Sequence, residues 1–149
     1  MGDDAVILMV DDNDDDVRLM QLAFEKVGLT NRLELVCNGD DAIKYLAGEC
    51  RYADRHRFPF PSLVMLDLKM PLCDGFEVLQ WVKEHPQLAA LPILVLSMSD
   101  RLEDVQRAYD SGANSFLVKP MGLAELRALA QAVKEFWVDR ASTPRMAPV

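Results

Sequence analysis

The sequence predicts a doubly wound α/β fold, in which helices cover both faces of a parallel β-sheet. Two observations support this class. Short apolar runs alternate five times with segments whose apolar residues recur at helical spacing. Four of these runs also end at a charged or polar residue, as buried parallel strands do where the chain leaves the sheet. A length of 149 residues, half of them hydrophobic, suits one such domain.

Five strands are predicted from the apolar runs. The first has six consecutive apolar residues and the others are shorter segments, and we expect all five to be buried on both faces of a sheet. Their ranges are 5–10, 33–36, 63–66, 92–96 and 116–118. Strands that alternate with helices in this way pair in parallel, because each helix returns the chain to the start of the next strand.

Helical apolar stripes fill the segments between the strands. The first stripe stops at Gly28 and consists of Val17, Met20, Phe24 and Val27. Shorter helices are predicted over 42–47, around 76–82 and over 102–109. The last stripe consists of Leu123, Leu126, Ala130, Val133 and Trp137. Together these helices complete five strand–helix units.

Two stretches lack any periodicity. Residues 49–61 form a long polar connection marked by prolines, and residues 141–149 contain two prolines near the end of the sequence. We therefore expect one domain over residues 1–140, a short flexible tail over 141–149, and no output domain.

Composition argues against several classes of protein. Sixteen lysine and arginine residues against twenty-four aspartate and glutamate residues give a net charge of −8, which disfavours binding to nucleic acid. Apolar runs fall short of the ~20 residues that a membrane-spanning helix needs, so no contact with a membrane is expected. The three cysteines form no CxxC pair, which favours a cytoplasmic location.

Charged and polar residues gather at the predicted strand ends. In a parallel sheet the carboxyl ends of the strands lie at one edge, which is where such folds bind their ligands. In strand order, the residues at these ends are Asp11 and Asp12, Asp67, Ser97 and Lys119. The sequence therefore predicts a single functional site built from all of them.

The residue types at this edge suit phosphoryl transfer. Clustered carboxylates favour a hard cation such as Mg2+, which prefers oxygen ligands. A lysine ammonium and a serine hydroxyl can contact phosphoryl oxygens, and charge neutralisation supplies most of the catalysis in such reactions. Asp67 ends the middle strand and is the predicted nucleophile. Residues 14–16, all aspartate, are instead expected to form a solvated face at a helix N-terminus.

Other motifs do not fit the sequence. An EF-hand that begins at Asp11 would need glycine in place of Asp16 and glutamate in place of Leu22. No glycine-rich nucleotide loop follows the first strand, and His56 and His85 lack partners at metal-ligand spacing. These observations argue against calcium, dinucleotide and zinc sites.

The site residues resemble those of the receiver domains of response regulators in two-component signalling. The similar motifs lie between residues 5 and 137 and are Val10-Asp11-Asp12, Leu66-Asp67 with Met70-Pro71 and Asp74-Gly75, Pro92-Ile93 to Ser97, and Leu117-Val118-Lys119-Pro120. The resemblance implies a flavodoxin-like, five-stranded sheet of strand order 2-1-3-4-5. It also implies a stand-alone response regulator that is not an enzyme beyond its own phosphorylation and dephosphorylation.

This resemblance implies roles for the acidic residues. Asp67 would accept a phosphoryl group from the phosphohistidine of a sensor histidine kinase. Asp12 and Asp67 would hold Mg2+, with help from Asp11 and the backbone carbonyl of Lys69. The predicted cofactor is therefore Mg2+.

Three further residues receive roles from the same resemblance. Ser97 and Lys119 would contact the phosphoryl group, and Phe116 falls at the switch aromatic of the family. Ser97 and Phe116 would then move together on phosphorylation. Met98 departs from the family pattern, which usually has a small residue there, and could narrow access to Asp67 or restrain the neighbouring loop.

A narrower resemblance links the chain to the single-domain regulators of phytochrome-type kinases. It rests on Tyr45-Leu46, Tyr52-Ala53-Asp54-Arg55, Pro59 and Pro61, together with the long connection over 49–61. Regulators of that kind tend to form homodimers through the last two helices and the fifth strand. Phe136 lies off the helical stripe, so it is either a dimer contact or a cover for the edge of the core.

Two other functions are weighed against this one. A receiver-like module could bind partners without phosphorylation, and Met98 is the residue that favours this alternative. An aspartate-nucleophile phosphatase of the haloacid-dehalogenase type would need a second aspartate two residues after the nucleophile, where this chain has Lys69.

Overall fold

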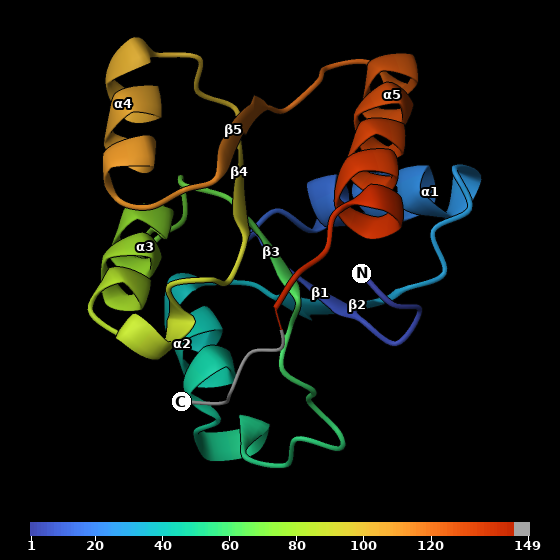
Figure 1. The fold of residues 1–149 in the computed structure, drawn as a ribbon. Coiled ribbons are helices and arrows are strands. Elements are labelled where there is room, and N and C mark those ends of the chain that lie inside the picture. Colours follow the sequence, from blue (N-terminus) through green and yellow to red (C-terminus); the bar gives the residue numbers. More distant parts are fainter. Residues whose placement is uncertain (145–149) are drawn as a thin grey trace.

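The computed structural model describes residues 1–144, and its centre is a five-stranded parallel sheet. The strand order is β2-β1-β3-β4-β5, which confirms the fold class and order that the sequence implied (Figure 1). The strands are β1 (Val6–Val10), β2 (Arg32–Val36), β3 (Leu63–Leu66), β4 (Ile93–Ser97) and β5 (Ser115–Val118). Val10 lies level with Val36 and Leu66, so three strands end at the same height.

Helices cover both faces of the sheet. α1 and α5 lie on one face, and α2, α3 and α4 lie on the other (Figure 1). The helices are α1 (Asp14–Lys26), α2 (Gly39–Ala47), α3 (Gly75–Lys83), α4 (Leu102–Asp110) and α5 (Leu123–Val133), and a π-helical segment, η3 (Lys134–Arg140), continues α5. Asn13, Asn38 and Asp74 cap α1, α2 and α3 by accepting a backbone N–H of the first turn.

Alternate residues of the central strands pack into two separate hydrophobic cores, one on each face of the sheet. Leu8 and Val10 of β1 pack toward α2, α3 and α4, whereas Ile7 and Met9 pack toward α1 and α5. All five residues of β1 and of β4 are buried. The continuous apolar runs of the sequence therefore correspond to strands covered on both faces, as predicted.

The two edge strands differ from that prediction. β2 has one buried residue, Val36, and β5 has none that is fully buried. Val118 of β5 is exposed. Complete burial of every strand was therefore wrong, because an edge strand has a neighbour on one side only and its helices cover it incompletely.

The last helix also departs from its predicted stripe. Leu126, Ala130 and Val133 are buried as expected, but Leu123 is 70% exposed. The π-helical geometry of η3 turns the later residues relative to the stripe of a regular α-helix. Val138 is therefore buried, beside the partly buried Trp137. A stripe drawn at constant 3.6-residue spacing cannot anticipate that shift.

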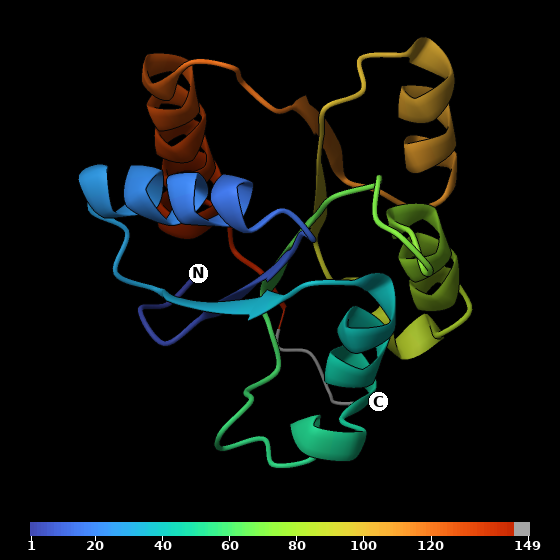
Figure 2. The ribbon, with the colours of Figure 1, turned by 180° about the vertical axis from the view of Figure 1, so that it is seen from behind.

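The connection between α2 and β3 is more ordered than its polar composition suggested. It contains a 3-10 helix, η1 (Cys50–Tyr52), and it enters the sheet at the amino end of β3 (Figure 2). Tyr52 and Phe58 pack on Tyr45 of α2, with ring centroids 5.1 and 6.1 Å away. This aromatic cluster fixes the connection against the helix.

The end of the sequence is described as far as residue 144, so residues 145–149 of the predicted tail lie outside the described residues. The amino group of Met1 donates to the carbonyls of Val138 and Ala141, at 2.9 and 2.8 Å. Among residues 1–144, no helix is long and apolar enough to cross a membrane.

Candidate functional site

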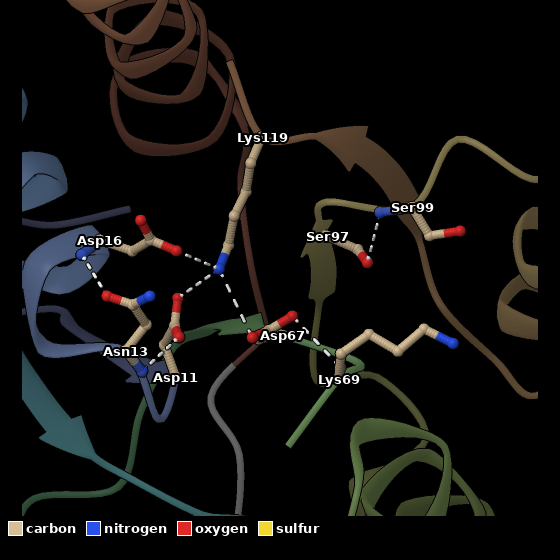
Figure 3. Close-up of polar contacts among 8 residues, drawn as sticks. All are labelled: Asp11, Asn13, Asp16, Asp67, Lys69, Ser97, Ser99 and Lys119. Carbon is tan, nitrogen blue, oxygen red and sulfur yellow. Dashed lines mark hydrogen bonds and ion pairs between the residues drawn. The ribbon is translucent and has the colours of Figure 1, made fainter. Parts of the chain in front are cut away.

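Backbone pairing places the predicted site residues at one edge of the sheet. The N–H of Asp67 donates to the carbonyl of Val10 at 2.9 Å, and the N–H of Lys119 donates to the carbonyl of Ser97 at 2.8 Å. The N–H of Asp11 donates in the same way to Val36. The hydrogen-bonded ladder therefore continues one residue past the strands, and it holds these side chains together (Figure 3).

Three carboxylates meet at the centre of this edge. One oxygen from each of Asp11, Asp12 and Asp67 lies within 4.8 Å of the others. Asp11 and Asp67 are buried, with 8% and 6% of their surface exposed, and Asp12 faces solvent. Oxygen ligands in this number, with an open side toward water, fit a hard divalent cation that keeps part of its water shell.

The buried ammonium of Lys119 faces the same carboxylates. Its Nζ donates to Asp11 at 2.8 Å, to Asp16 at 2.9 Å and to Asp67 at 3.4 Å. Burial by itself lowers the pKa of Lys119, but the hydrogen bonds to Asp11 and Asp16 and the charges of Asp67 and Asp11 outweigh it and raise that pKa. Lys119 is therefore charged at any physiological pH.

Asp67 lies in an environment that opposes its ionisation. Burial, together with the charge of Asp11, raises the pKa of Asp67 to about 6, even though the charge of Lys119 acts in the other direction. The backbone N–H of Lys69 also donates to an Asp67 oxygen, at 3.3 Å. The carboxylates of this cluster outnumber its one ammonium, and their chemistry fits a hard divalent cation.

Asp16 belongs to this site, although the sequence analysis assigned it to a solvated acidic face. That assignment is correct for Asp14 and Asp15, which are exposed, and wrong for Asp16, which contacts Lys119. α1 begins at Asp14, so its third residue turns back toward the sheet edge. The signal in the sequence is the position of Asp16 four residues before the buried Met20, on the same helical face.

A second polar network surrounds Ser97 at the start of the β4–α4 loop. Ser97 is fully buried, and its Oγ accepts the N–H of Ser99 at 3.2 Å. The Ser99 hydroxyl donates to Asp104 of α4 at 2.5 Å, and Lys69 lies 3.5 Å from the same carboxylate. The Ser99 hydrogen bond, followed by the charge of Lys69, lowers the pKa of Asp104. Ser97 is thereby tied to the loop rather than to Asp67 (Figure 3).

The remaining predicted residues lie outside the charged centre. Phe116 is partly buried against the core under α2, α3 and α4, and its N–H donates to the hydroxyl of Tyr109. Met98 is 55% exposed. Phe136 is 60% exposed beside a groove of about 610 Å³ between β5 and the end of α5. A contact between two copies of the chain through this residue stays a prediction.

Comparisons with known proteins agree with this geometry. Residues 7–131 match the family described as response regulator receiver domain. FilR2 of Methanothrix harundinacea is 36% identical over 142 residues, 95% of this chain and 89% of that protein. Response regulator Rcp1 of Synechocystis is 32% identical over 139 residues, 93% of this chain and 92% of Rcp1.

Solved structures show the same likeness. The phosphorylated cyanobacterial phytochrome response regulator RcpA superposes with a TM-score of 0.87 at 34% identity, over 95% of this chain and 99% of RcpA. The Mn2+-bound form of Rcp1 superposes with a TM-score of 0.85 at 32% identity, with the same coverage. With its sheet order, its acidic cluster and its buried lysine, this chain belongs to the response regulator receiver domain family.

Proposed function

We propose that this chain is a response regulator that accepts a phosphoryl group on Asp67 from a histidine kinase and signals by a change of conformation. The observation that carries the proposal is the placement of Asp67. It is a buried carboxylate at the carboxyl edge of the sheet, and it shares the ammonium of Lys119 with a second buried carboxylate, Asp11. Such a carboxylate can act as a nucleophile toward phosphorus.

In the transfer step, an Asp67 carboxylate oxygen attacks the phosphorus of the kinase phosphohistidine. The new O–P bond forms as the P–N bond breaks, and the imidazole leaves with the electron pair. Lys119 follows the phosphoryl oxygens, because its Nζ lies 3.4 Å from the Asp67 carboxylate. The products are an acyl phosphate on Asp67 and a free histidine on the kinase.

The proposed cofactor is Mg2+, held by Asp11, Asp12, Asp67 and the backbone carbonyl of Lys69. The cluster of three carboxylates supports this assignment through its chemistry, and the Mn2+-bound form of Rcp1 supports it by analogy. When bound, Mg2+ would neutralise the charge between the acceptor carboxylate and the incoming phosphoryl group. The raised pKa of Asp67 is consistent with a site that requires such a cation.

The proposed switch moves Ser97 and Phe116. Phosphorylation replaces the single negative charge of the Asp67 carboxylate by a group that carries nearly two. The Ser97 hydroxyl can then donate to a phosphoryl oxygen. Ser97 would draw Ser99 and its partner Asp104 with it, because the Ser99 N–H bonds to the Ser97 oxygen. The β4–α4 loop moves inward, and the Phe116 side chain turns into the space that the loop has left. Phosphate would favour one of two existing arrangements.

The proposed partners are a sensor histidine kinase of phytochrome type and a second copy of this chain. The phytochrome response regulator RcpA and the regulator Rcp1, which resemble this chain over nearly its full length, support the first. The exposed Phe136 and the groove that it lines between β5 and α5 support a homodimer through α4, β5 and α5. A cytoplasmic location accompanies this role, as expected for three free cysteines.

The phosphatase alternative is disfavoured by the position of Lys69. Its side chain is exposed and pairs with Asp104, so it cannot take the part of a general acid beside Asp67. We therefore propose no enzymatic activity beyond phosphorylation and dephosphorylation of the chain itself. The phosphorylation-independent module stays as the outcome that a failed phosphorylation experiment would favour.

Intact mass after incubation with acetyl phosphate tests the proposal, with and without Mg2+, for the wild type and Asp67→Asn. We expect a Mg2+-dependent gain of one phosphoryl group in the wild type alone. No gain in any sample would favour a partner module that works without phosphate. A gain in the variant would mean that another carboxylate is the acceptor.

The phosphorylated samples also test the switch and the dimer. Sedimentation should show a shift in the monomer–dimer equilibrium of the wild type on phosphorylation, and Ser97→Ala should accept phosphate but lose that shift. A Ser97→Ala protein that dimerises normally on phosphorylation would contradict the switch.

A further inference from the structure

We propose that Asp16 is a positioning residue of this site, which holds the Lys119 ammonium in the unphosphorylated protein and releases it to the phosphoryl group. This inference rests on the proposed function, in which Asp67 accepts that group. It adds a fourth carboxylate, contributed by the first turn of α1, to the three that form the acidic cluster.

The hydrogen-bonding capacity of Lys119 is fully used before phosphorylation. An ammonium group has three N–H donors, and Lys119 has three carboxylate partners, at 2.8, 2.9 and 3.4 Å. The two shorter contacts are to Asp11 and Asp16, whereas the longest is to Asp67 (Figure 3). A phosphoryl oxygen can therefore gain a hydrogen bond from this ammonium only if one carboxylate gives it up.

Asp16 is the partner that can be released at the lowest cost. Asp11 is buried and also accepts the N–H of Asn13 at 3.0 Å. The side chain of Asp16 is 33% exposed, and Lys119 is its carboxylate's only hydrogen-bond donor within the described part of the chain. Water can replace the ammonium at Asp16 but has little access to Asp11.

The local structure of α1 holds Asp16 in reach of Lys119. The side chain of Asn13 caps the helix by accepting the N–H of Asp16 at 3.1 Å, which fixes the backbone of that residue. One turn later, Met20 is buried and orients this face of the helix toward the sheet. Asp14 and Asp15 belong to the same turn, but both are exposed and neither contacts Lys119.

Charge gives the direction of the effect. Phosphorylated Asp67 carries about one more negative charge than the free carboxylate. The Asp16 carboxylate then competes with the phosphoryl group for the Lys119 ammonium, and its negative charge repels the phosphoryl group. Removal of the Asp16 charge should therefore stabilise the phosphorylated arrangement relative to the unphosphorylated one.

The affinity for fluoroberyllate, a mimic of the phosphoryl group, measures this competition directly. With Mg2+ present, calorimetry should show that Asp16→Asn binds fluoroberyllate about three- to tenfold more tightly than the wild type, the range of a charge-assisted hydrogen bond at a partly exposed site. Asp15→Asn removes the same charge one residue away and should stay within about twofold of the wild type. Asp16→Glu keeps the charge and should return the affinity toward the wild-type value.

The outcomes separate this inference from the proposed function. If the wild type neither binds fluoroberyllate nor gains a phosphoryl group, the proposed function itself fails. If the wild type binds but Asp16→Asn and Asp15→Asn behave alike, Asp16 contributes only general charge and the inference fails alone. Weaker binding by Asp16→Asn, with a thermal unfolding midpoint like that of the wild type, would also overturn it, because Asp16 would then support the phosphoryl group.

Discussion

A cation lies at each end of the sheet, buried at one end and partly buried at the other, and the two cations have opposite surroundings. At the carboxyl end, Lys119 faces three carboxylates, which raise its pKa. At the amino end, Arg55 of the α2–β3 connection donates to the backbone carbonyls of Tyr45, Leu46 and Phe58, at 2.7, 2.9 and 3.3 Å. Burial lowers the pKa of Arg55, and its hydrogen-bond partners in the described part of the chain are neutral carbonyls.

Neutral partners make Arg55 a structural residue. It satisfies carbonyls at the end of α2, where a helix leaves its last carbonyls without internal partners. Gly48 ends that helix with φ of +69°, and a Cβ there would lie 2.8 Å from the Arg55 guanidinium. Tyr45 adds a hydrogen bond from its hydroxyl to the carbonyl of Pro59. Each of these groups has a hydrogen-bond partner among residues 1–144, so the contacts at this end hold the connection against α2.

Charged partners make Lys119 suitable for a reaction. The carboxylates around it repel one another, so the site carries an unfavourable energy that a cation or a change of partners relieves. The contacts at the amino end of the sheet therefore stabilise the fold, whereas the charged groups at the carboxyl end are suited to react. Substitutions at the amino end should therefore cost stability, and those at the carboxyl end should change function or even raise stability.

The largest expected effect is at the amino end. Tyr45→Ala should lower the free energy of unfolding by about 3–4 kcal/mol, because Tyr45 is 1% exposed and packs against two aromatic rings. Tyr45→Phe keeps the ring and should cost about 1 kcal/mol through the lost hydrogen bond to Pro59. Urea unfolding measures both. If folded Tyr45→Ala is phosphorylated at the wild-type rate, the two ends of the sheet act independently. A large loss of phosphorylation rate would contradict that independence.

A smaller effect of opposite sign is expected at the carboxyl end. Without divalent cations at pH 7, Asp67→Asn should raise the free energy of unfolding by about 1 kcal/mol, since the buried charge that it removes is unfavourable. The pKa of about 6 in the folded protein lies above the usual carboxyl value of 3.8, so ionisation costs stability as the pH rises between these values, and the full cost is present above pH 6. Below pH 3.8 the carboxyl is protonated in both states and this cost is absent.

The difference between Asp67→Asn and the wild type should therefore grow as the pH rises from about 4 to about 6. Thermal unfolding at several pH values, with Asp14→Asn as an exposed control, measures it. Addition of Mg2+ should narrow the difference by stabilising the wild type alone. Destabilisation by Asp67→Asn at pH 7 would mean that Lys119 more than compensates the buried charge.

The smallest effect concerns Lys69, whose ion pair with Asp104 joins the β3–α3 loop to the first turn of α4. The Lys69 side chain is 60% exposed, and such pairs contribute about 0–1 kcal/mol. Lys69→Gln should therefore change the free energy of unfolding by less than about 0.5 kcal/mol, and 1 M salt should remove the difference. A decrease of more than about 2 kcal/mol in the free energy of unfolding would show that contacts at the carboxyl end also stabilise the fold.

Sequence patterns anticipated the elements that depend on neighbours along the chain. The apolar runs predicted β1, β3 and β4, because central strands are buried on both faces. The residues that follow β1, β3 and β5 were the site residues Asp11, Asp67 and Lys119. Exposure of the edge strands was missed, because the place of a strand in the sheet does not follow from its own composition. The aromatic packing of the α2–β3 connection was missed for the same reason.

By itself, then, the sequence determined the fold class, the edge of the sheet that holds the site, and the residue types gathered there. Only the tertiary structure decided that Asp16 joins Lys119, that Ser97 is tied to Ser99, and that Val138 is buried behind a π-helical turn. The physical reason is distance along the chain. Asp16 and Lys119 are 103 residues apart, and their contact depends on how α1 docks beside the end of β5 rather than on any local preference.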